Sequence, residues 1–221
     1  MKVFSPAQQD AYNVLRKSHI GGALMDMGLG KTGVGLRLAL TDPKPILLVG
    51  PIPVIKSVWE QEAKTWEETK HLTFGLYRGT KEERAKVASQ AKDIYMVNPE
   101  MLEEALKELP QCNSLYIDES SMFKNASSLR FRALSNVLYR YKYRWILTGT
   151  PAPNGLLDVW SQIYLLDRGA ALGPTPPQTR CARRAFIGVA RALVASPIIP
   201  AVMTPQQYVQ EKAAASGSSF Y

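Results

Sequence analysis

The stretch GALMDMGLGKTGVGLRLAL, at residues 22–40, decides which fold the chain is expected to adopt. It reads as a short apolar strand, a glycine-rich turn and a helix that begins near Lys31. Gly28 and Gly30 let the backbone curl so that successive amide N–H groups face an anion, and the helix dipole adds to their attraction for phosphate. Lys31 is then placed to reach the β- and γ-phosphates of a nucleotide, and the Thr32 hydroxyl to bind Mg²⁺.

A second interpretation of this turn stays open. The glycines can simply make a tight connection between strand and helix, with Lys31 in solvent. The strict pattern GxxxxGK[ST] is not met, because Met25 stands where its first glycine belongs. The strand before the turn and the helix after it favour phosphate binding.

A second motif, SLYIDESS at residues 114–121, ends an apolar strand with two acids. Asp118 can hold a magnesium ion with its water shell, and Glu119 can polarise an attacking water. Taken alone, such a pair is more often a strand entering a loop. Together with the glycine-rich turn upstream, it indicates one site for a nucleotide phosphate and Mg²⁺.

Short apolar runs alternate along the chain with longer segments of helical spacing. This alternation predicts an α/β fold with a mainly parallel sheet, right-handed crossovers and helices on both faces. Ligands then bind where the strands end. The expected strands are residues 22–26, 46–50, 73–77, 94–97, 115–118 and 145–148.

Apolar residues from Ile55 to Trp66, and again from Phe131 to Tyr141, recur every three or four positions, which predicts two amphipathic helices. Thr80 with Glu83 predicts a capping box, and Asn98 before Pro99 suits a cap and a first helical position. Core packing is the favoured role for the large aromatics of these regions, namely Trp59, Trp66, Tyr116 and Trp145.

The composition is that of an ordinary globular protein with a net charge of +8. From Arg168 onward there are six basic residues and one acid, which suits a polyanionic partner or simply solubility. Cys112 and Cys181 form no CxxC pair, and His19 and His71 receive no chemical role. We expect no export signal and no membrane span, and a location in the bacterial cytosol or a phage-infected host cell.

The character of the chain changes after residue 173, where six prolines and an Ala/Arg-rich piece follow. No strand–helix unit is visible there, although a short helix around residues 183–194 is plausible. We therefore expect one domain over residues 1–172 and a divergent, weakly helical or disordered tail over residues 173–221.

Seven motifs in order resemble the Snf/Swi-type DNA translocases of helicase superfamily two, above all their compact phage and bacterial members. The resemblance covers residues 4–173 and implies the RecA-like first lobe of a DNA-stimulated ATPase, with ATP and Mg²⁺ as cofactors. The motifs are FSPAQ, DMGLGKT, VGPIPVIKSVWEQEAKTW, LYRGTKEER, DIYMVNPEML, YIDESSMFKN and WILTGTPAPN.

The resemblance also implies a role for each matching residue. ATP would be bound by Gln8, with Gln9 as the fallback, and by Met27, Gly28, Leu29, Gly30, Lys31 and Thr32. Lys31, Asp118 and Glu119 would be catalytic, and Thr32 and Asp118 would hold Mg²⁺. Coupling of the nucleotide state to DNA would involve Ser121, Thr148, Gly149 and Thr150. Segments that line the path of double-stranded DNA, without reading its sequence, would contribute Pro51, Lys56, Gly79, Thr80, Asn98 and Asn125.

The chain departs from the family pattern in two places. Ser121 stands where the family usually has a histidine, which puts the coupling of hydrolysis to motion in doubt. Nothing between residues 174 and 221 resembles the second lobe with its arginine finger, which typically contributes about 10³ to 10⁵ in rate. We therefore expect a truncated or frame-shifted motor that is weakly active or inactive unless a second lobe acts in trans.

Two other functions remain open. The chain could be a nucleic acid binding or regulatory module that keeps the fold without a useful ATPase. A small kinase would use the same glycine-rich turn, but it needs an acceptor site and an arginine lid, and neither is apparent.

Overall fold

The segments on either side of the glycine-rich turn form a strand, β1 (Ile20–Leu24), and a helix, α2 (Lys31–Ala39). They belong to a computed structural model that describes residues 3–150, 157–170, 172–176, 178 and 198–199. The strand ends two residues earlier than expected. Its last pair is Leu24 with Thr148, and the carbonyls of Met25 and Asp26 instead accept hydrogen bonds from the Lys31 ammonium.

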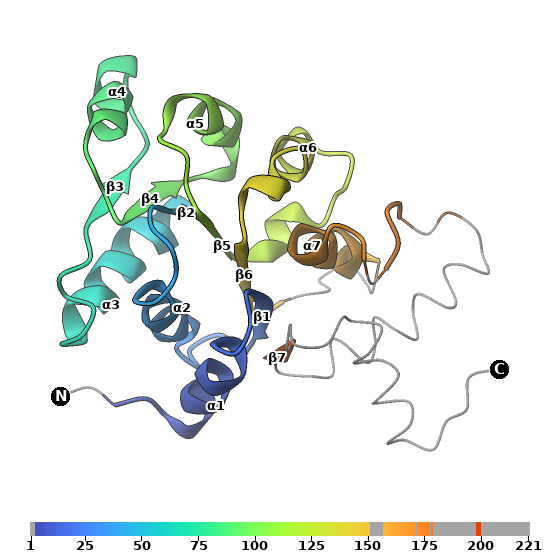
Figure 1. The fold of residues 1–221 in the computed structure, drawn as a ribbon, viewed down its shortest axis with the longest axis horizontal. Coiled ribbons are helices and arrows are strands. Elements are labelled where there is room, and N and C mark those ends of the chain that lie inside the picture. The colour runs from blue at the N-terminus through green and yellow to red at the C-terminus, as the bar shows by residue number, and fades with distance from the viewer. Residues whose placement is uncertain (1–2, 151–156, 171, 177, 179–197, 200–221) are drawn as a thin grey trace.

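Six parallel strands form the sheet, in the order β3, β4, β2, β5, β6, β1 (Figure 1). Each of the six lies within two residues of its expected place, so the predicted parallel sheet is confirmed. A two-residue strand, β7 (Ile198–Ile199), pairs antiparallel with β1, although no strand was expected in that part of the sequence. The remaining strands are β2 (Ile46–Val49), β3 (Phe74–Leu76), β4 (Ile94–Val97), β5 (Ser114–Asp118) and β6 (Tyr143–Thr148).

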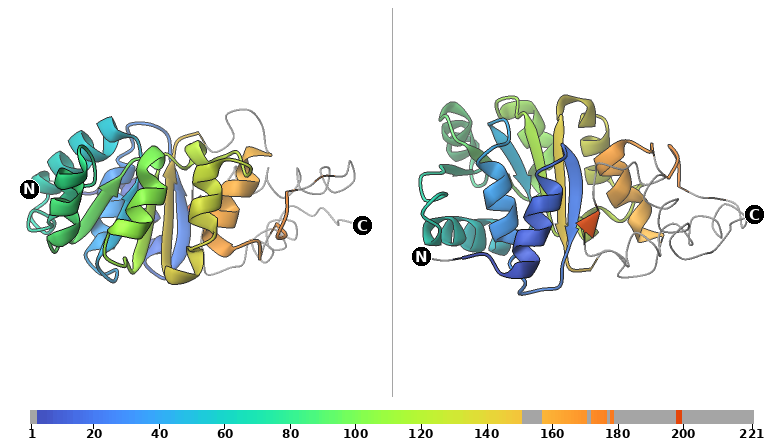
Figure 2. Two further views of the ribbon diagram at one scale, coloured as in Figure 1. Left: turned by 90° about the horizontal axis from the view of Figure 1, so that it is seen from above. Right: turned by 60° about the horizontal axis from the view of Figure 1, so that its bottom comes forward.

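Helices cover both faces of this sheet. Successive strand residues alternate between two apolar clusters: Leu47 and Val49 belong to one, and Ile46 and Leu48 to the other. The two layers lie on opposite sides of the row of strands in Figure 1, and Figure 2 shows the sheet between them. One layer holds α1 (Pro6–Leu15), α2 and α3 (Glu60–Thr65); the other holds α4 (Lys81–Ser89), α5 (Leu102–Glu108), α6 (Leu129–Ser135) and α7 (Asp158–Asp167).

The expected helix signals are borne out in part. Thr80 and Glu83 form the predicted capping box of α4, whereas Asn98 precedes a 3₁₀ turn (Pro99–Met101) and its side chain makes no cap hydrogen bond. The first amphipathic segment is a π-helix (Val54–Trp59) that continues into α3. The second was predicted too long, because α6 ends at Ser135 and a separate 3₁₀ turn (Leu138–Arg140) follows.

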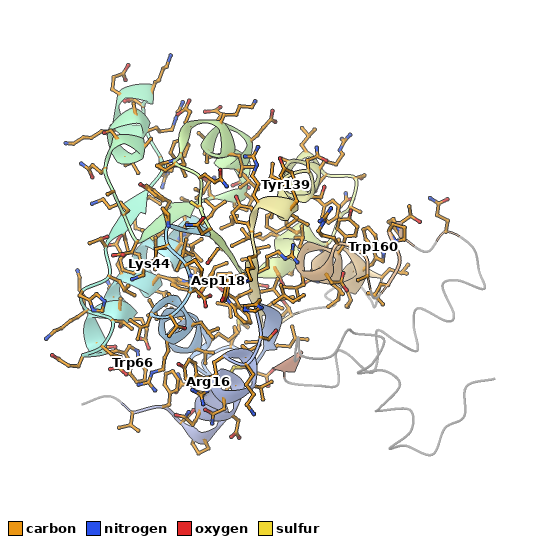
Figure 3. The ribbon with its side chains drawn as sticks, viewed as in Figure 1. Arg16, Lys44, Trp66, Asp118, Tyr139 and Trp160 are labelled. Carbon is orange, nitrogen blue, oxygen red and sulfur yellow. The ribbon has the colours of Figure 1, made fainter. Side chains whose placement is uncertain are left out.

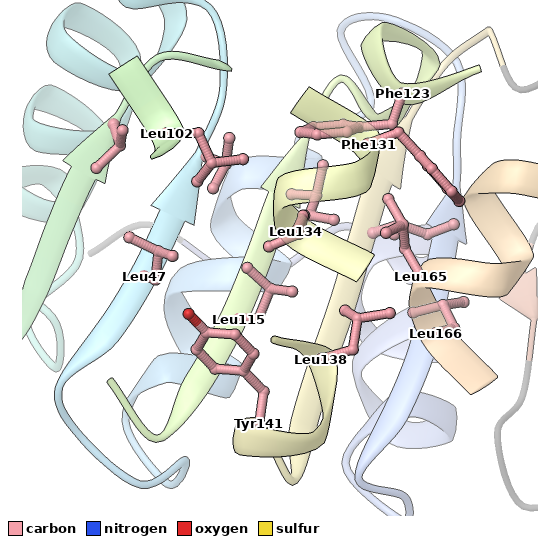
Figure 4. Packing of buried hydrophobic residues seen from close by; sticks show 14 of the residues in the cluster. Leu47, Leu102, Leu115, Phe123, Phe131, Leu134, Leu138, Tyr141, Leu165 and Leu166 are labelled. Atoms are coloured by element: carbon pink, nitrogen blue, oxygen red, sulfur yellow. The ribbon is translucent and has the colours of Figure 1, made fainter. Parts of the chain in front are cut away.

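Burial of the large aromatics is confirmed, since Trp59, Trp66, Tyr116 and Trp145 are each at most 3% exposed. Figure 4 shows the cluster on the side of α5, α6 and α7, with Tyr141 near the start of the strands and Phe123 near their ends. His19 and His71 are exposed. The helix anticipated around residues 183–194 lies outside the described residues. Among the described helices, none has the length and hydropathy needed to cross a membrane.

The buried carboxylate of Asp42 ties two of these aromatics together. It accepts hydrogen bonds from the Tyr116 hydroxyl at 2.6 Å and from the Trp145 indole N–H at 2.5 Å. Burial raises the pKa of Asp42, against the opposing effect of these two donors. A group with a raised pKa stabilises the fold most at acid pH, and that contribution is lost as pH rises through its folded-state value.

Asp42→Ala should lower the free energy of unfolding by about 3 kcal/mol, because each stranded donor costs about 1–3 kcal/mol. Asp42→Asn keeps an acceptor oxygen and removes the buried charge, so its stability relative to wild type should improve as pH rises above the unfolded-state pKa of an aspartate, about 4. Urea unfolding followed by tryptophan fluorescence measures both effects. Equal stability of wild type and the alanine variant would contradict this role for Asp42.

Candidate functional site

Three neighbouring strands end at the candidate site. The glycine-rich turn follows β1, Asp118 and Glu119 close β5, and Thr148 closes β6, which lies between the other two strands. The carboxyl ends of parallel strands meet at one edge of a sheet, so these groups share a surface although they are far apart in sequence. Figure 3 shows Asp118 at the centre of the molecule, next to α2.

The turn has the backbone geometry that an anion site requires. Gly28 and Gly30 have φ angles of +84° and +75°, which residues with a Cβ rarely adopt. Gly30 is the N-cap of α2 and offers no side-chain oxygen to the first N–H groups of the helix. The side chains of Met27 and Leu29 point outward, 81% and 46% exposed. Amide N–H groups at the start of α2 are thereby left for a ligand.

The Lys31 ammonium donates to the carbonyl oxygens of Met25 at 2.7 Å and Asp26 at 3.0 Å. These two bonds hold the side chain over the turn. The arrangement places a positive charge beside the glycine-rich turn, as expected of a lysine that binds phosphate.

Gln8 is buried and connects α1 to this turn. Its Nε2 donates to the Gly30 carbonyl at 3.0 Å, and its Oε1 accepts from the Ser5 backbone N–H at 2.9 Å. The Ser5 hydroxyl in turn accepts from the Gln8 backbone, which completes a capping box. A Cβ at Gly30 would come within 2.2 Å of Gln8 Nε2, so glycine is required there by space as well as by φ. Gln9 bonds instead to Asn13, away from the turn.

A cavity of about 500 Å³ opens over the turn. Its size is that of a small-molecule site, and all of the residues predicted to bind ATP line it except Met27. Three of the residues that line it were not predicted from the sequence. They are Ser5, which caps α1, and Val58 and Glu62, which belong to the π-helix and α3. It is lined by Ser5, Gln8, Gly28, Leu29, Gly30, Lys31, Thr32, Val58 and Glu62.

Asp118 is 6% exposed and accepts a hydrogen bond of 2.7 Å from the Trp59 indole N–H. Burial raises the pKa of Asp118, while the Trp59 bond and the nearby Lys31 charge act to lower it. Trp59 was predicted only as a core residue. A buried indole N–H usually has a hydrogen-bond acceptor. From this rule, the sequence could have indicated that Trp59 also bonds to a polar group.

Glu119 has a left-handed backbone, with φ of +57°, which is uncommon for a residue that carries a Cβ. Its Oε1 accepts three hydroxyl hydrogen bonds, from Ser121 at 2.6 Å, Thr148 at 2.8 Å and Thr150 at 3.1 Å. Three of the four residues predicted to couple the nucleotide state to DNA therefore donate hydrogen bonds to the same carboxylate. Gly149, between the two threonines, lies against the turn, since a Cβ there would be 3.3 Å from the Met25 carbonyl and from the Met27 amide.

The residues proposed to line the DNA path all follow the ends of strands. Pro51 and Lys56 come after β2, Gly79 and Thr80 after β3, and Asn98 after β4. Thr80 caps α4, and the Asn98 amide donates to Glu100, so both have a structural role as well. The Asn125 carboxamide accepts from Ser127 in the loop after β5. The structure thus brings the set to one edge without showing a nucleic acid contact.

The donor set at the site suits Mg²⁺. The ion prefers oxygen ligands, keeps several waters and is commonly held by one or two carboxylates together with substrate phosphates. Asp118 supplies a carboxylate at the end of β5, and Thr32 supplies a hydroxyl in the first turn of α2. Among the described residues, no group of three or more His, Cys, Asp or Glu side chains could hold a metal ion. A site that encloses Mg²⁺ with such side chains alone is therefore not found there.

Comparison with known proteins gives a consistent result. A family model described as the SNF2-related domain matches residues 8–171. Putative protein p41 of Acyrthosiphon pisum secondary endosymbiont phage 1 is 30% identical over 192 residues, covering 79% of this chain and 42% of its own length. Transcription regulatory protein SNF2 of Saccharomyces cerevisiae is 32% identical over 160 residues, covering 66% of this chain and 9% of its own.

The structure of the Sulfolobus solfataricus SWI2/SNF2 ATPase core in complex with dsDNA has the same fold. It superposes with a TM-score of 0.67 at 24% identity, covering 98% of this chain and 43% of the other. The chain therefore spans less than half the length of each of these proteins.

Trp59→Phe should raise the pKa of Asp118 further, because it removes a hydrogen bond to the charged form while keeping most of the buried ring. Trp66→Phe is the matched control, since the Trp66 indole donates to Glu62. Carboxyl ¹³C shifts followed against pH would report the change. An Asp118 titration that stays at its wild-type position in Trp59→Phe would show that the indole bond does not act on the carboxylate.

Proposed function

Because the chain belongs to the SNF2-related domain family, we propose that it is the ATP-binding first lobe of a DNA-stimulated motor of the Snf/Swi type. In this proposal the turn at residues 27–32 binds the phosphates of ATP. Residues 1–172 form the lobe, and residues 173–221 are a divergent tail, from which β7 adds a two-residue strand beside β1. The cytosol of a bacterium or of a phage-infected cell is the proposed location.

One observation supports the proposal above the others: the Lys31 turn and the two acids lie at the same edge of the sheet, after β1 and β5, with β6 between them. Lys31 is among the groups that lower the pKa of the buried Asp118 carboxyl, and this electrostatic effect supports a shared role for the lysine and that acid. ATP hydrolysis needs both, because a phosphate must be held while its developing charge is stabilised.

The chain's own groups divide the chemical work. The amides of the turn and Lys31 hold the phosphates, and Thr32 with Asp118 would hold Mg²⁺. When bound, the ion supplies positive charge that offsets the charge developing on the transferred phosphoryl group. Glu119 orients the attacking water and accepts its proton. The hydroxyls of Thr148, Thr150 and Ser121 hold that carboxylate in place.

Full turnover requires groups that this lobe does not offer. Arginine fingers contribute about 10³ to 10⁵ in rate and come from outside the phosphate loop. We propose that a second lobe supplies one. Double-stranded DNA would lie across the strand ends, near Pro51, Lys56, Gly79, Thr80, Asn98 and Asn125, and would be held through its backbone.

Lys31→Ala should abolish Mg²⁺-dependent ATP binding, whereas Glu119→Gln should retain it, because Glu119 acts on water and not on the phosphates. Lys64→Ala, at an exposed position on α3, is the control for loss of one positive charge. Isothermal titration of the full chain with ATP, with and without Mg²⁺, measures the three affinities. Absence of Mg²⁺-dependent ATP binding in the wild type, with DNA still bound, would favour the non-catalytic nucleic acid binding module instead.

A further inference from the structure

The edge where the strands begin, opposite the candidate site, carries a concentration of positive charge. Three cations alternate with tyrosines in YRYKYR, at residues 139–144, which leads into β6. The segment after α1 reaches the same edge, because the Arg144 backbone N–H donates to the His19 carbonyl at 2.8 Å. Figure 3 places Tyr139 and Arg16 on the two sides of the strand row here.

The cations of this edge are exposed and have no carboxylate partner. Among the described residues, the side chains of Lys17, Arg140 and Lys142 enter no ion pair. Some other cations of the lobe do: Arg84 bonds to Glu104 at 3.0 Å, and Lys107 bonds to Glu103 at 3.0 Å. Because no described carboxylate pairs with them, the three cations of the edge keep their positive charge.

Aromatic rings support these cations without neutralising them. The Arg140 guanidinium lies 5.7 Å from the centre of the Tyr139 ring, and the Lys142 ammonium lies 5.9 Å from that of Tyr143. The His19 ring packs on the edge of Tyr143 at 4.6 Å. Tyr139 is 65% exposed, although a large aromatic of this kind is usually buried. The rings thus form an exposed surface with the cations above them.

The acids that face this edge do not cancel its charge. Asp42, which acts on His19, is buried and already bonded to Tyr116 and Trp145. Asp167 accepts a hydrogen bond from the Gly169 N–H, and its negative charge acts on Arg144. The positive charge of Arg168 acts on Arg144 in the opposite direction. Burial and Arg168 lower the pKa of Arg144 to about 10, and its buried Nε has no acceptor. An added anion would relieve this excess of positive charge.

We propose that this basic edge binds the sugar–phosphate backbone of duplex DNA, at a surface separate from the nucleotide site. Arg, Lys and Tyr are typical phosphate partners, and the mixture of unpaired cations with hydroxyl-bearing rings suits a backbone that is not read for sequence. The six residues of β6 separate the edge from the site by about 20 Å. Binding here should therefore not depend on ATP. The basic edge consists of Arg16, Lys17, His19, Tyr139, Arg140, Lys142 and Tyr143.

The test is the affinity of the full chain for a fluorescent 30-base-pair duplex, measured by anisotropy across a salt series without nucleotide. Arg140→Ala with Lys142→Ala should weaken binding and lower the slope of log K against log salt by about 2, because each lost phosphate contact lowers it by about 0.9. Lys64→Ala with Lys86→Ala removes the same charge from exposed positions on α3 and α4 and should change the slope much less. Charges in the tail are common to all variants and cancel in the comparison.

An unchanged slope in the Arg140/Lys142 variant, or an equal loss in the control, would overturn the proposal. Competition by poly-glutamate as effective as that by duplex DNA would also overturn it, because the edge would then be a contact for acidic proteins. ATP binding by the same variant should be that of the wild type. Failure of ATP binding in every chain would reject the proposed function and leave this inference standing.

Discussion

The turn between β1 and α2 is the constraint on which the candidate site depends. Gly30 begins α2 in a left-handed conformation, and its carbonyl is held by the buried Gln8 amide, so the helix start has one position relative to α1. From that position the Lys31 ammonium reaches back to the strand end, and its charge reaches Asp118. A small change of the backbone at Gly30 would displace the helix dipole, the lysine and Thr32 together.

A second set of contacts joins this turn to the rest of the sheet edge. Glu119 gathers hydroxyls from the segments after β5 and β6, and Gly149 lets the second of these segments approach the turn closely. Ser121 takes part in this set although it replaces the histidine of the family pattern. Serine cannot carry charge, so here it serves as a hydrogen-bond donor to the carboxylate. The site thus joins three strand ends through short contacts.

The repeating parts of the fold were predictable from the sequence, because alternation of apolar runs with helical spacing is a local property. The placement of the glycine-rich turn and of the two acids after strands was also predictable, because both motifs directly follow apolar runs. Contacts between distant segments were not predictable in the same way. The bond from Trp59 to Asp118, the three hydroxyls on Glu119 and the bond from Gln8 to the Gly30 carbonyl depend on tertiary packing, which no spacing rule reports. β7 was not predicted because a strand of two residues is too short to show a periodic pattern.

The most direct test of the account is the affinity of Gly30→Ala for Mg²⁺-ATP. The substituted Cβ would meet Gln8 Nε2 at 2.2 Å in a left-handed backbone, so the turn must change shape. The account predicts at least a tenfold loss of affinity, about 1.4 kcal/mol, with the helical circular dichroism signal retained. Wild-type affinity in the folded variant would contradict the claim that the geometry of this turn creates the phosphate site.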